Sequence, residues 1–239
     1  MKKLIFRCAI LAGLAGLAFG ATITVTDSSG SFSNPVPVAG ITITNGDPHS
    51  EIRWGQPASN AGQSGYNFDA TIPPVVTKNL VPGGTTDWFL LAGFQHVNQP
   101  IYAPSLEHVD LDVSLTFDID GGAAITKTFG YLLNHEETTN AVPCAYPSVS
   151  PCADRVTVSA PASGIFTVGN VVYTLVLQFS TDGGQTTESE FITQENQTND
   201  AGIYARFSSR VEDVPEIPEP TTFLLMGAGL TGLALLRRR

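Results

Sequence analysis

The feature that most constrains the fold is a strict alternation of polar and apolar residues over positions 108–120. The apolar residues occupy the odd positions, and they are Val109, Leu111, Val113, Leu115, Phe117 and Ile119. A period of two places successive side chains on opposite faces of a strand. Burying one such face of six side chains contributes on the order of 10 kcal/mol before the entropy of folding is subtracted. The pattern predicts a long antiparallel strand with one buried face and one wet face.

Shorter segments between the two ends of the chain show the same period. Residues 22–26 and 41–44 alternate, and Ile203, Ala205 and Phe207 indicate a last strand. Residues 166–168 and 171–180 flank the pair Gly169-Asn170, which is typical of a hairpin with a two-residue turn. No segment there has a helical apolar period. We therefore predict an all-β chain that forms a single antiparallel β-sandwich, jelly-roll-like, of about ten to twelve strands over residues 22–211.

The N-terminus predicts export. Lys2, Lys3 and Arg7 precede an apolar stretch over residues 9–19, which is too short to span a bilayer. A basic start followed by such a stretch is typical of a secretory signal helix, here residues 1–21, with small residues before Ala21 for a signal peptidase to read. Cys8 precedes the apolar stretch and is lost with the signal.

The C-terminus has three parts in a fixed order. A linker over residues 212–220 ends in Pro218, Glu219 and Pro220, and sixteen uncharged residues follow at 221–236. The chain then closes on three basic residues, Arg237, Arg238 and Arg239. The uncharged run predicts a short transmembrane helix near the lower length limit, and the arginines predict a cytoplasmic end. A helix of the soluble core is disfavoured because three arginines follow it directly.

This tail resembles the PEP-CTERM sorting signal of Gram-negative bacteria. The resemblance implies that an exosortase cuts near the Pro-Glu-Pro motif. The helix would then be a sorting signal that is removed, and not a permanent membrane anchor. It further implies an inner-membrane precursor, then a place at the cell surface or outside the cell. Processing partners would be signal peptidase and exosortase. Hosts of this system typically make exopolysaccharide and biofilm. The resemblance therefore suggests exopolysaccharide as a further partner.

A second resemblance covers most of residues 52–158. Residues 95–98 read Gln-His-Val-Asn and resemble the Thr-His-x-Asn motif of the THxN family of PEP-CTERM proteins, with Gln95 in place of the threonine. Residues 52–55, 62–68 and 135–140 also resemble that family, as do Cys144, Cys152 and Asp154. The resemblance implies a β-sandwich and a surface address. It implies no reaction.

The motif supplies the candidate site residues. His96 and Asn98 are two apart on an extended segment, so they share a face, and the segment around them is apolar. With His135, Glu137 and Asn140 they could form a buried polar network that fixes loops, which is the preferred interpretation. A metal or carbohydrate site made of the same groups is the alternative. Zinc would require His96, His135 and a carboxylate to lie together; on balance we predict no metal and no cofactor.

Two cysteines remain after secretion. Cys144 and Cys152 are close in sequence, and export would place them in an oxidising compartment. Because the number of remaining cysteines is even, we predict a disulfide between them. Two cysteines alone do not complete a zinc site. Residues 118–122 resemble the start of a calcium loop but lack the downstream glutamate, which favours an acidic turn.

The net charge and the absence of catalytic sequence motifs limit the classes of function that the sequence favours. The formal net charge is -10, and the part between the ends keeps six basic and 21 acidic residues, a balance of −15. Such a surface repels nucleic acid and favours solubility or attraction of divalent cations or cationic polymers. No catalytic motif for a serine hydrolase, a zinc protease or a phosphate-binding loop occurs. We predict a non-enzymatic surface or extracellular-matrix protein associated with exopolysaccharide.

Two alternatives to that function stay open. A carbohydrate-binding module would use exposed aromatic side chains, for which the candidates are Trp54, Tyr66, Trp88 and Tyr102. A polysaccharide hydrolase would need two carboxylates that face each other across a cleft.

Overall fold

The computed structural model describes residues 20–71, 75–148, 151–159 and 165–212. All regular structure in these ranges is β-strand, which confirms the all-β prediction. The first sheet has the strand order β14-β11-β10-β9-β1-β6. Its strands are β14 (Glu190–Thr193), β11 (Asp154–Val158), β10 (Ile125–Glu136), β9 (His108–Ile119), β1 (Ala21–Val36) and β6 (Val76–Leu80).

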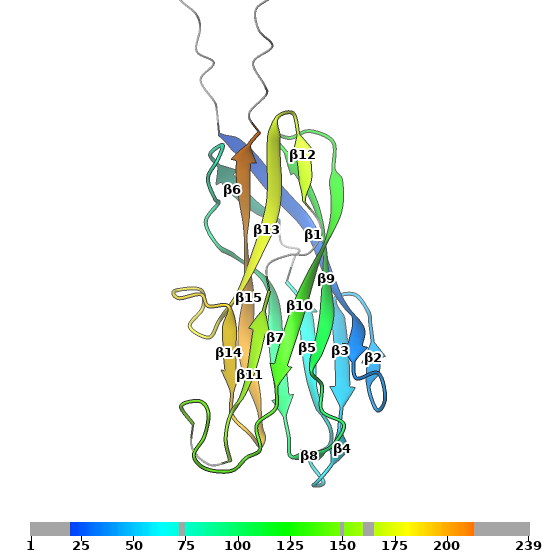
Figure 1. Ribbon diagram of the computed structural model, residues 1–239. Coiled ribbons are helices and arrows are strands. Elements are labelled where there is room, and N and C mark those ends of the chain that lie inside the picture. Colours follow the sequence, from blue (N-terminus) through cyan, green and yellow to red (C-terminus); the bar gives the residue numbers. More distant parts are fainter. Residues whose placement is uncertain (1–19, 72–74, 149–150, 160–164, 213–239) are drawn as a thin grey trace, which may run out of the picture.

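The second sheet has the order β12-β13-β15-β7-β5-β3-β2 and also contains only antiparallel neighbours. Its strands are β12 (Phe166–Val168), β13 (Val171–Ser180), β15 (Gln197–Val211), β7 (Phe89–Asn98), β5 (Ser64–Ala70), β3 (His49–Trp54) and β2 (Thr42–Thr44). The short strands β4 (Gln56–Pro57) and β8 (Ile101–Tyr102) pair separately and lie at the lower end of the molecule in Figure 1.

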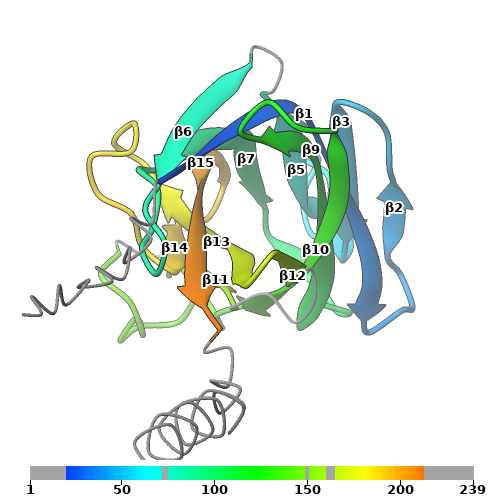
Figure 2. The same cartoon turned by 90° about the horizontal axis from the view of Figure 1, so that it is seen from above.

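The two sheets are curled and face each other across one hydrophobic core (Figure 2). Phe117 of β9 packs on Phe207 of β15 with ring centroids 5.4 Å apart. The hydroxyl of Tyr131 on β10 donates a hydrogen bond to the carbonyl of Leu175 on β13, at 2.9 Å. The packing joins both sheets into one body, as expected for a sandwich. The finer expectation of jelly-roll-like connections stays a prediction.

Strand β9 confirms the long alternating strand. Its apolar side chains are buried at every second position, and it pairs with β1 on one side and β10 on the other. It ends at Ile119 because Asp120 and Gly121 take positive φ angles of 54° and 70°. Two such residues suit the tight turn of a hairpin. The Asp118 carboxylate accepts the Gly121 amide and the Asp120 carboxylate accepts the Thr22 amide, so residues 118–122 form an acidic turn.

Two strands extend well beyond their sequence signals. Residues 22–26 begin the 16-residue strand β1, whose pairing with β9 shifts register between Val25 and Asp27 and again between Ser33 and Val36. Each shift breaks the period of two, so alternation does not reveal the second half. The last strand, β15, starts at Gln197, in a polar stretch ahead of Ile203. The hairpin of residues 166–180 forms as predicted, with Gly169 and Asn170 at its turn.

The predicted end segments fall almost wholly outside the described residues. Of the signal helix, residues 1–21, only Gly20 and Ala21 are described, and Ala21 begins β1. The linker beyond Glu212, the transmembrane helix at 221–236 and the terminal arginines are not described. Within the described ranges, no helix has the length and apolar character that a bilayer span requires.

Candidate functional site

Buried polar side chains from both sheets meet next to the loop between β10 and β11. This loop lies at the lower end of the molecule in Figure 1. The second sheet contributes Trp54, Tyr66, His96 and Asn98, and the first contributes His135, Asp154 and Thr193. Each lies at an inward position of its strand, which is why polar groups enter an otherwise apolar core. His96, Asn98 and Asp154 are all 0% exposed.

One ring nitrogen of His96 lies in this cluster without a hydrogen-bond partner among the described residues. Its Nδ1 lies 2.7 Å from the Thr193 hydroxyl, and that hydroxyl donates to the Asp154 carbonyl oxygen at 3.4 Å. In the tautomer with the proton on Nδ1, the Thr193 hydroxyl accepts that proton and Nε2 carries the lone pair. Nε2 has no hydrogen-bond partner among the described residues. Burial, and then the charge of His135, lower the pKa of His96, so the ring is neutral.

His135 faces His96 from the opposite sheet. The two ring centroids are 5.2 Å apart and the rings are nearly perpendicular, at 89°. His135 Nδ1 lies 2.7 Å from the Tyr66 hydroxyl, and its Nε2 lies 3.4 Å from a carboxylate oxygen of Glu137. Trp54 packs against both imidazoles, with centroid distances of 5.7 Å to His96 and 5.1 Å to His135. Aromatic packing and hydrogen bonds thus fix both rings.

Three carboxylates complete the cluster. Asp154 accepts the Thr138 amide through Oδ1 at 2.7 Å, and its Oδ2 has no partner among the described residues. Glu195 accepts the Asn140 side-chain amide through Oε2 at 3.1 Å, and its Oε1 is likewise bare. Glu137 accepts the Ser105 hydroxyl at 3.1 Å.

No lysine or arginine in the described part of the chain forms a salt bridge with Asp154, Glu137 or Glu195. Arg155, the neighbour of Asp154, faces outward to Glu136 and Glu190. Burial and then the charge of Glu137 raise the pKa of Asp154 to about 7, and burial also raises the pKa of Glu195. Among the described residues, His135 is therefore the basic side chain in contact with this carboxylate group, through Glu137.

The donor atoms lie close enough to share a cation. His96, His135 and Asp154 each offer one ligand atom, all within 4.8 Å of one another. Glu137, Asp154 and Glu195 form a second such group, so Asp154 belongs to both. Two imidazoles and a carboxylate are a donor set that zinc takes, whereas three carboxylates suit harder cations.

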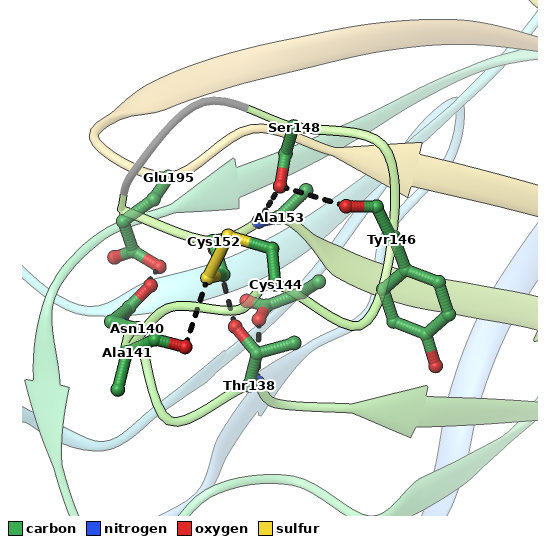
Figure 3. The surroundings of a disulfide bond; sticks show 10 residues. Thr138, Asn140, Ala141, Cys144, Tyr146, Ser148, Cys152, Ala153 and Glu195 are labelled. Atoms are coloured by element: carbon green, nitrogen blue, oxygen red, sulfur yellow. Dashed lines mark hydrogen bonds between the residues drawn. A yellow bond between two sulfur atoms is a disulfide. The ribbon is translucent and has the colours of Figure 1, made fainter.

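A disulfide-bonded loop covers this end of the sandwich (Figure 3). Cys144 and Cys152 are bonded, with Cα atoms 5.2 Å apart, which confirms the predicted disulfide. The Thr138 hydroxyl donates to the Cys152 carbonyl at 3.2 Å, and Asn140 in the same loop reaches Glu195. The loop therefore fixes side chains of the polar cluster from outside.

Cys144→Ser is expected to lower the melting temperature by about 5 °C without unfolding the sandwich. The closed loop is short, and a disulfide of this size contributes about 2–3 kcal/mol in the chain-entropy model, which for a domain of this length means roughly 2–4 °C per kcal/mol. Cys152→Ser should give the same loss. Mass spectrometry of the alkylated, non-reduced wild type should find neither cysteine modified, and two free thiols would refute the bond.

The structure brings all five motif-derived residues to this one place. His96, Asn98, His135, Glu137 and Asn140 lie in or beside the cluster, and three of them bond to partners that sequence reasoning did not single out. Those partners are Thr193 and Glu195. The sequence does contain a signal for them. Residues 191, 193 and 195 all face inward at every second position, and the first is phenylalanine whereas the next two are polar.

Two of the proposed sugar-stacking residues are corrected by the structure. Trp54 and Tyr66 are both 0% exposed, so neither can stack on a carbohydrate at the surface. The Trp88 ring is covered by the guanidinium of Arg206, 4.4 Å from its centroid. Tyr102 is exposed. The four aromatic residues form no common platform.

Comparison with known proteins identifies the tail. Residues 216–239 match the PEP-CTERM protein-sorting motif. The matched segment contains Pro218, Glu219, Pro220 and the three terminal arginines, the sorting residues that the sequence predicts, all outside the described residues. The PEP-CTERM motif implies export, a membrane-anchored precursor in a Gram-negative bacterium, and processing by exosortase. No curated protein matches the chain.

Proposed function

We propose that this chain is a non-enzymatic surface or extracellular-matrix protein of the THxN group, sorted to the cell exterior through its PEP-CTERM tail. The observation that carries the proposal is the match of the tail to the sorting motif at residues 216–239. The disulfide Cys144–Cys152 supports it, because such bonds persist in oxidising compartments outside the cytoplasm.

The enclosure of the polar cluster supports a non-enzymatic role. A catalytic centre must admit its substrate, but the side chains of His96, His135 and Asp154 are fully buried between the sheets. Access is partial at the edge of the cluster, where the Glu137 side chain is 21% exposed and Asn140 is also only partly buried. The geometry favours a group that holds the fold together over one that turns over a substrate.

Association with exopolysaccharide is the finer part of the proposal. Its support is the sorting tail, since hosts of this system typically produce such polymers, and the acidic character of the chain. A carbohydrate-binding module with an aromatic platform is the weaker candidate, because Trp54 and Tyr66 are buried. In a producing host, most of the wild-type protein should remain with the polymer after the cells are removed. Recovery in the polymer-free fraction would contradict the association.

Replacing Pro218, Glu219 and Pro220 with alanine is expected to leave a full-length precursor in the membrane. The motif is the part of the tail that the processing enzyme reads, and the uncharged segment then keeps the chain in the bilayer. Immunoblots of membrane and released fractions from an exosortase-positive host measure the effect. Pro215→Ala, in the same linker but ahead of the motif, is the matched control and should be processed like wild type. Release of the triple mutant in shortened form, as efficiently as wild type, would overturn the sorting proposal.

A further inference from the structure

We propose that the polar cluster binds one divalent transition-metal ion of the zinc type, held between the two sheets by His96 Nε2, His135 Nε2 and the Asp154 carboxylate. Glu137 is the fourth ligand in this proposal. The ion would tie β7, β10 and β11 to the disulfide-bonded loop.

The first support is a concentration of bare polar atoms. The described residues contain eight buried side-chain nitrogen or oxygen atoms without a hydrogen-bond partner. Six of them belong to this cluster, and they lie on Trp54, His96, Asn98, Asn140, Asp154 and Glu195. Folded proteins leave few such atoms, because each costs roughly 1–3 kcal/mol when desolvated without a partner. Two of the six, His96 Nε2 and Asp154 Oδ2, are ligands in the proposal, whereas Trp54 Nε1 carries a hydrogen and cannot bind a cation.

The second support is how these side chains are anchored. His96 Nδ1 is hydrogen-bonded to the Thr193 hydroxyl, and His96 Nε2 has no partner among the described residues. Asp154 Oδ1 accepts a hydrogen bond from the Thr138 amide, and Asp154 Oδ2 has no partner among them. Asn98 follows the same rule, with its amide donating to the Thr193 carbonyl and its oxygen bare. Metal ligands are typically built so, with an outer hydrogen bond that orients the side chain and a free donor atom that points at the ion.

The spacing at His135 also fits a shared ion. Its Nε2 lies 3.4 Å from the Glu137 carboxylate oxygen, which is long for an N–H···O hydrogen bond. Two ligands of one tetrahedral zinc ion, at about 2.1 Å each, lie about 3.4 Å apart. The Tyr66 hydroxyl, 2.7 Å from His135 Nδ1, can accept the Nδ1 proton and so leave the Nε2 lone pair free for the ion.

Calcium and water explain the cluster less well. Calcium takes oxygen ligands, so a calcium ion on the carboxylates would leave the His96 lone pair without a partner. A buried water could satisfy several of the bare atoms, but it brings no positive charge to Asp154, Glu137 and Glu195. A zinc-type ion accounts for the imidazoles and offsets the charge together.

Glu137 connects the cluster to the surface of the molecule. A hollow of about 230 Å³ lies against the β10–β11 loop, and Glu137, Thr138 and Cys152 help to line it. Glu137 both lines this hollow and lies 3.4 Å from the buried His135 Nε2, and its side chain is 21% exposed. An ion could therefore enter after the sandwich has folded.

The first test measures the metal content of the full chain. The chain is expressed with its signal peptide in a Gram-negative host that is grown with zinc. It is then purified in detergent without chelators. Plasma mass spectrometry should find about one zinc per chain. His96→Gln and His135→Gln should each lower that content at least tenfold. His49→Gln and His108→Gln are the matched controls, because these are the other two histidines and neither belongs to the cluster. Both should keep the zinc, and loss in His49→Gln alone would mean an adventitious surface ion beside Asp69.

A second measurement covers the case in which the histidine variants do not fold. Chelator-treated wild-type chain is titrated with zinc chloride while its melting temperature is followed. One equivalent should raise the melting temperature by about 5 °C or more, since a ligand that binds only the native state stabilises it. Absence of zinc from the purified chain together with no response to micromolar zinc would overturn the proposal. So would a stoichiometric calcium ion that survives both histidine replacements.

Discussion

In chelator-treated protein at pH 8, replacing Asp154 with asparagine is expected to raise the melting temperature by about 5 °C. The wild-type carboxylate is 0% exposed, and no basic residue in the described part of the chain pairs with it. Asparagine keeps an oxygen for the Thr138 amide, which Asp154 now accepts at 2.7 Å, and removes the buried charge. An uncompensated buried charge is among the costliest groups in a protein interior.

The pH dependence of this effect has a definite sign. Burial raises the pKa of folded Asp154 to about 7 from the 3.8 of an unperturbed aspartate, so the folded state holds the proton more tightly than the unfolded state. The metal-free wild type therefore loses stability as pH rises from about 4 to about 7, by about 4 kcal/mol at most. The asparagine variant lacks this dependence. Its advantage should vanish near pH 4, grow to about pH 7 and stay level above.

Melting curves of both proteins from pH 4 to pH 8, with and without zinc, check this prediction. With one equivalent of zinc the order should reverse, because the wild type gains an ion that the variant binds poorly. Asp182→Asn is the matched control. Asp182 accepts hydrogen bonds from Thr186 and Ser180 in an exposed turn, and these hold its pKa below the usual range, so its replacement should not stabilise the protein. A lower melting temperature for Asp154→Asn at every pH would refute the account of the buried charge.

Trp54→Ala is expected to cause the largest loss of stability, about 10 °C or more in melting temperature. Trp54 is 0% exposed and packs against Tyr66, His96 and His135. Removing a fully buried tryptophan side chain leaves a cavity and typically costs about 3–5 kcal/mol. A domain of this size shifts by roughly 2–4 °C per kcal/mol.

Trp88→Ala provides the matched comparison, since the chain has only these two tryptophans. Trp88 is partly exposed, and its main partner is the Arg206 guanidinium stacked on its ring. Such a contact contributes about 0.5–1 kcal/mol, so the loss should be about 1–3 °C. Thermal denaturation followed by circular dichroism measures both variants. Equal losses would show that Trp54 does not support the core as described.

The sequence predicts those strands whose side chains alternate without interruption. Strand β9 and the hairpin of β12 and β13 follow directly from their period of two. Strand β1 does not, because small and polar residues make up most of its second half and two register shifts change which residues face inward. Its length is set by pairing with β9, which is a property of the neighbouring strand.

The candidate site was only partly predictable for a related reason. The spacing of His96 and Asn98 shows that they share a face, and the family resemblance adds His135. Thr193 and Glu195 are distant in sequence and match no motif, and their alternation with Phe191 does not show what they contact. The pairing of β14 with β11 at the edge of the first sheet brings Thr193 to His96. The hydrogen bonds of the cluster form separate groups around Thr193, Glu137 and Glu195, and the atoms without a partner can be recognised only once the side chains are placed.

The most direct test of the metal proposal is X-ray absorption at the zinc edge of the purified full chain. The account predicts about four nitrogen or oxygen ligands near 2.0–2.1 Å and outer-shell scattering from two imidazole rings. It predicts no sulfur at 2.3 Å, because both mature cysteines are held in the disulfide. A spectrum without imidazole scattering, or with sulfur ligands, would contradict a site made by His96, His135 and Asp154.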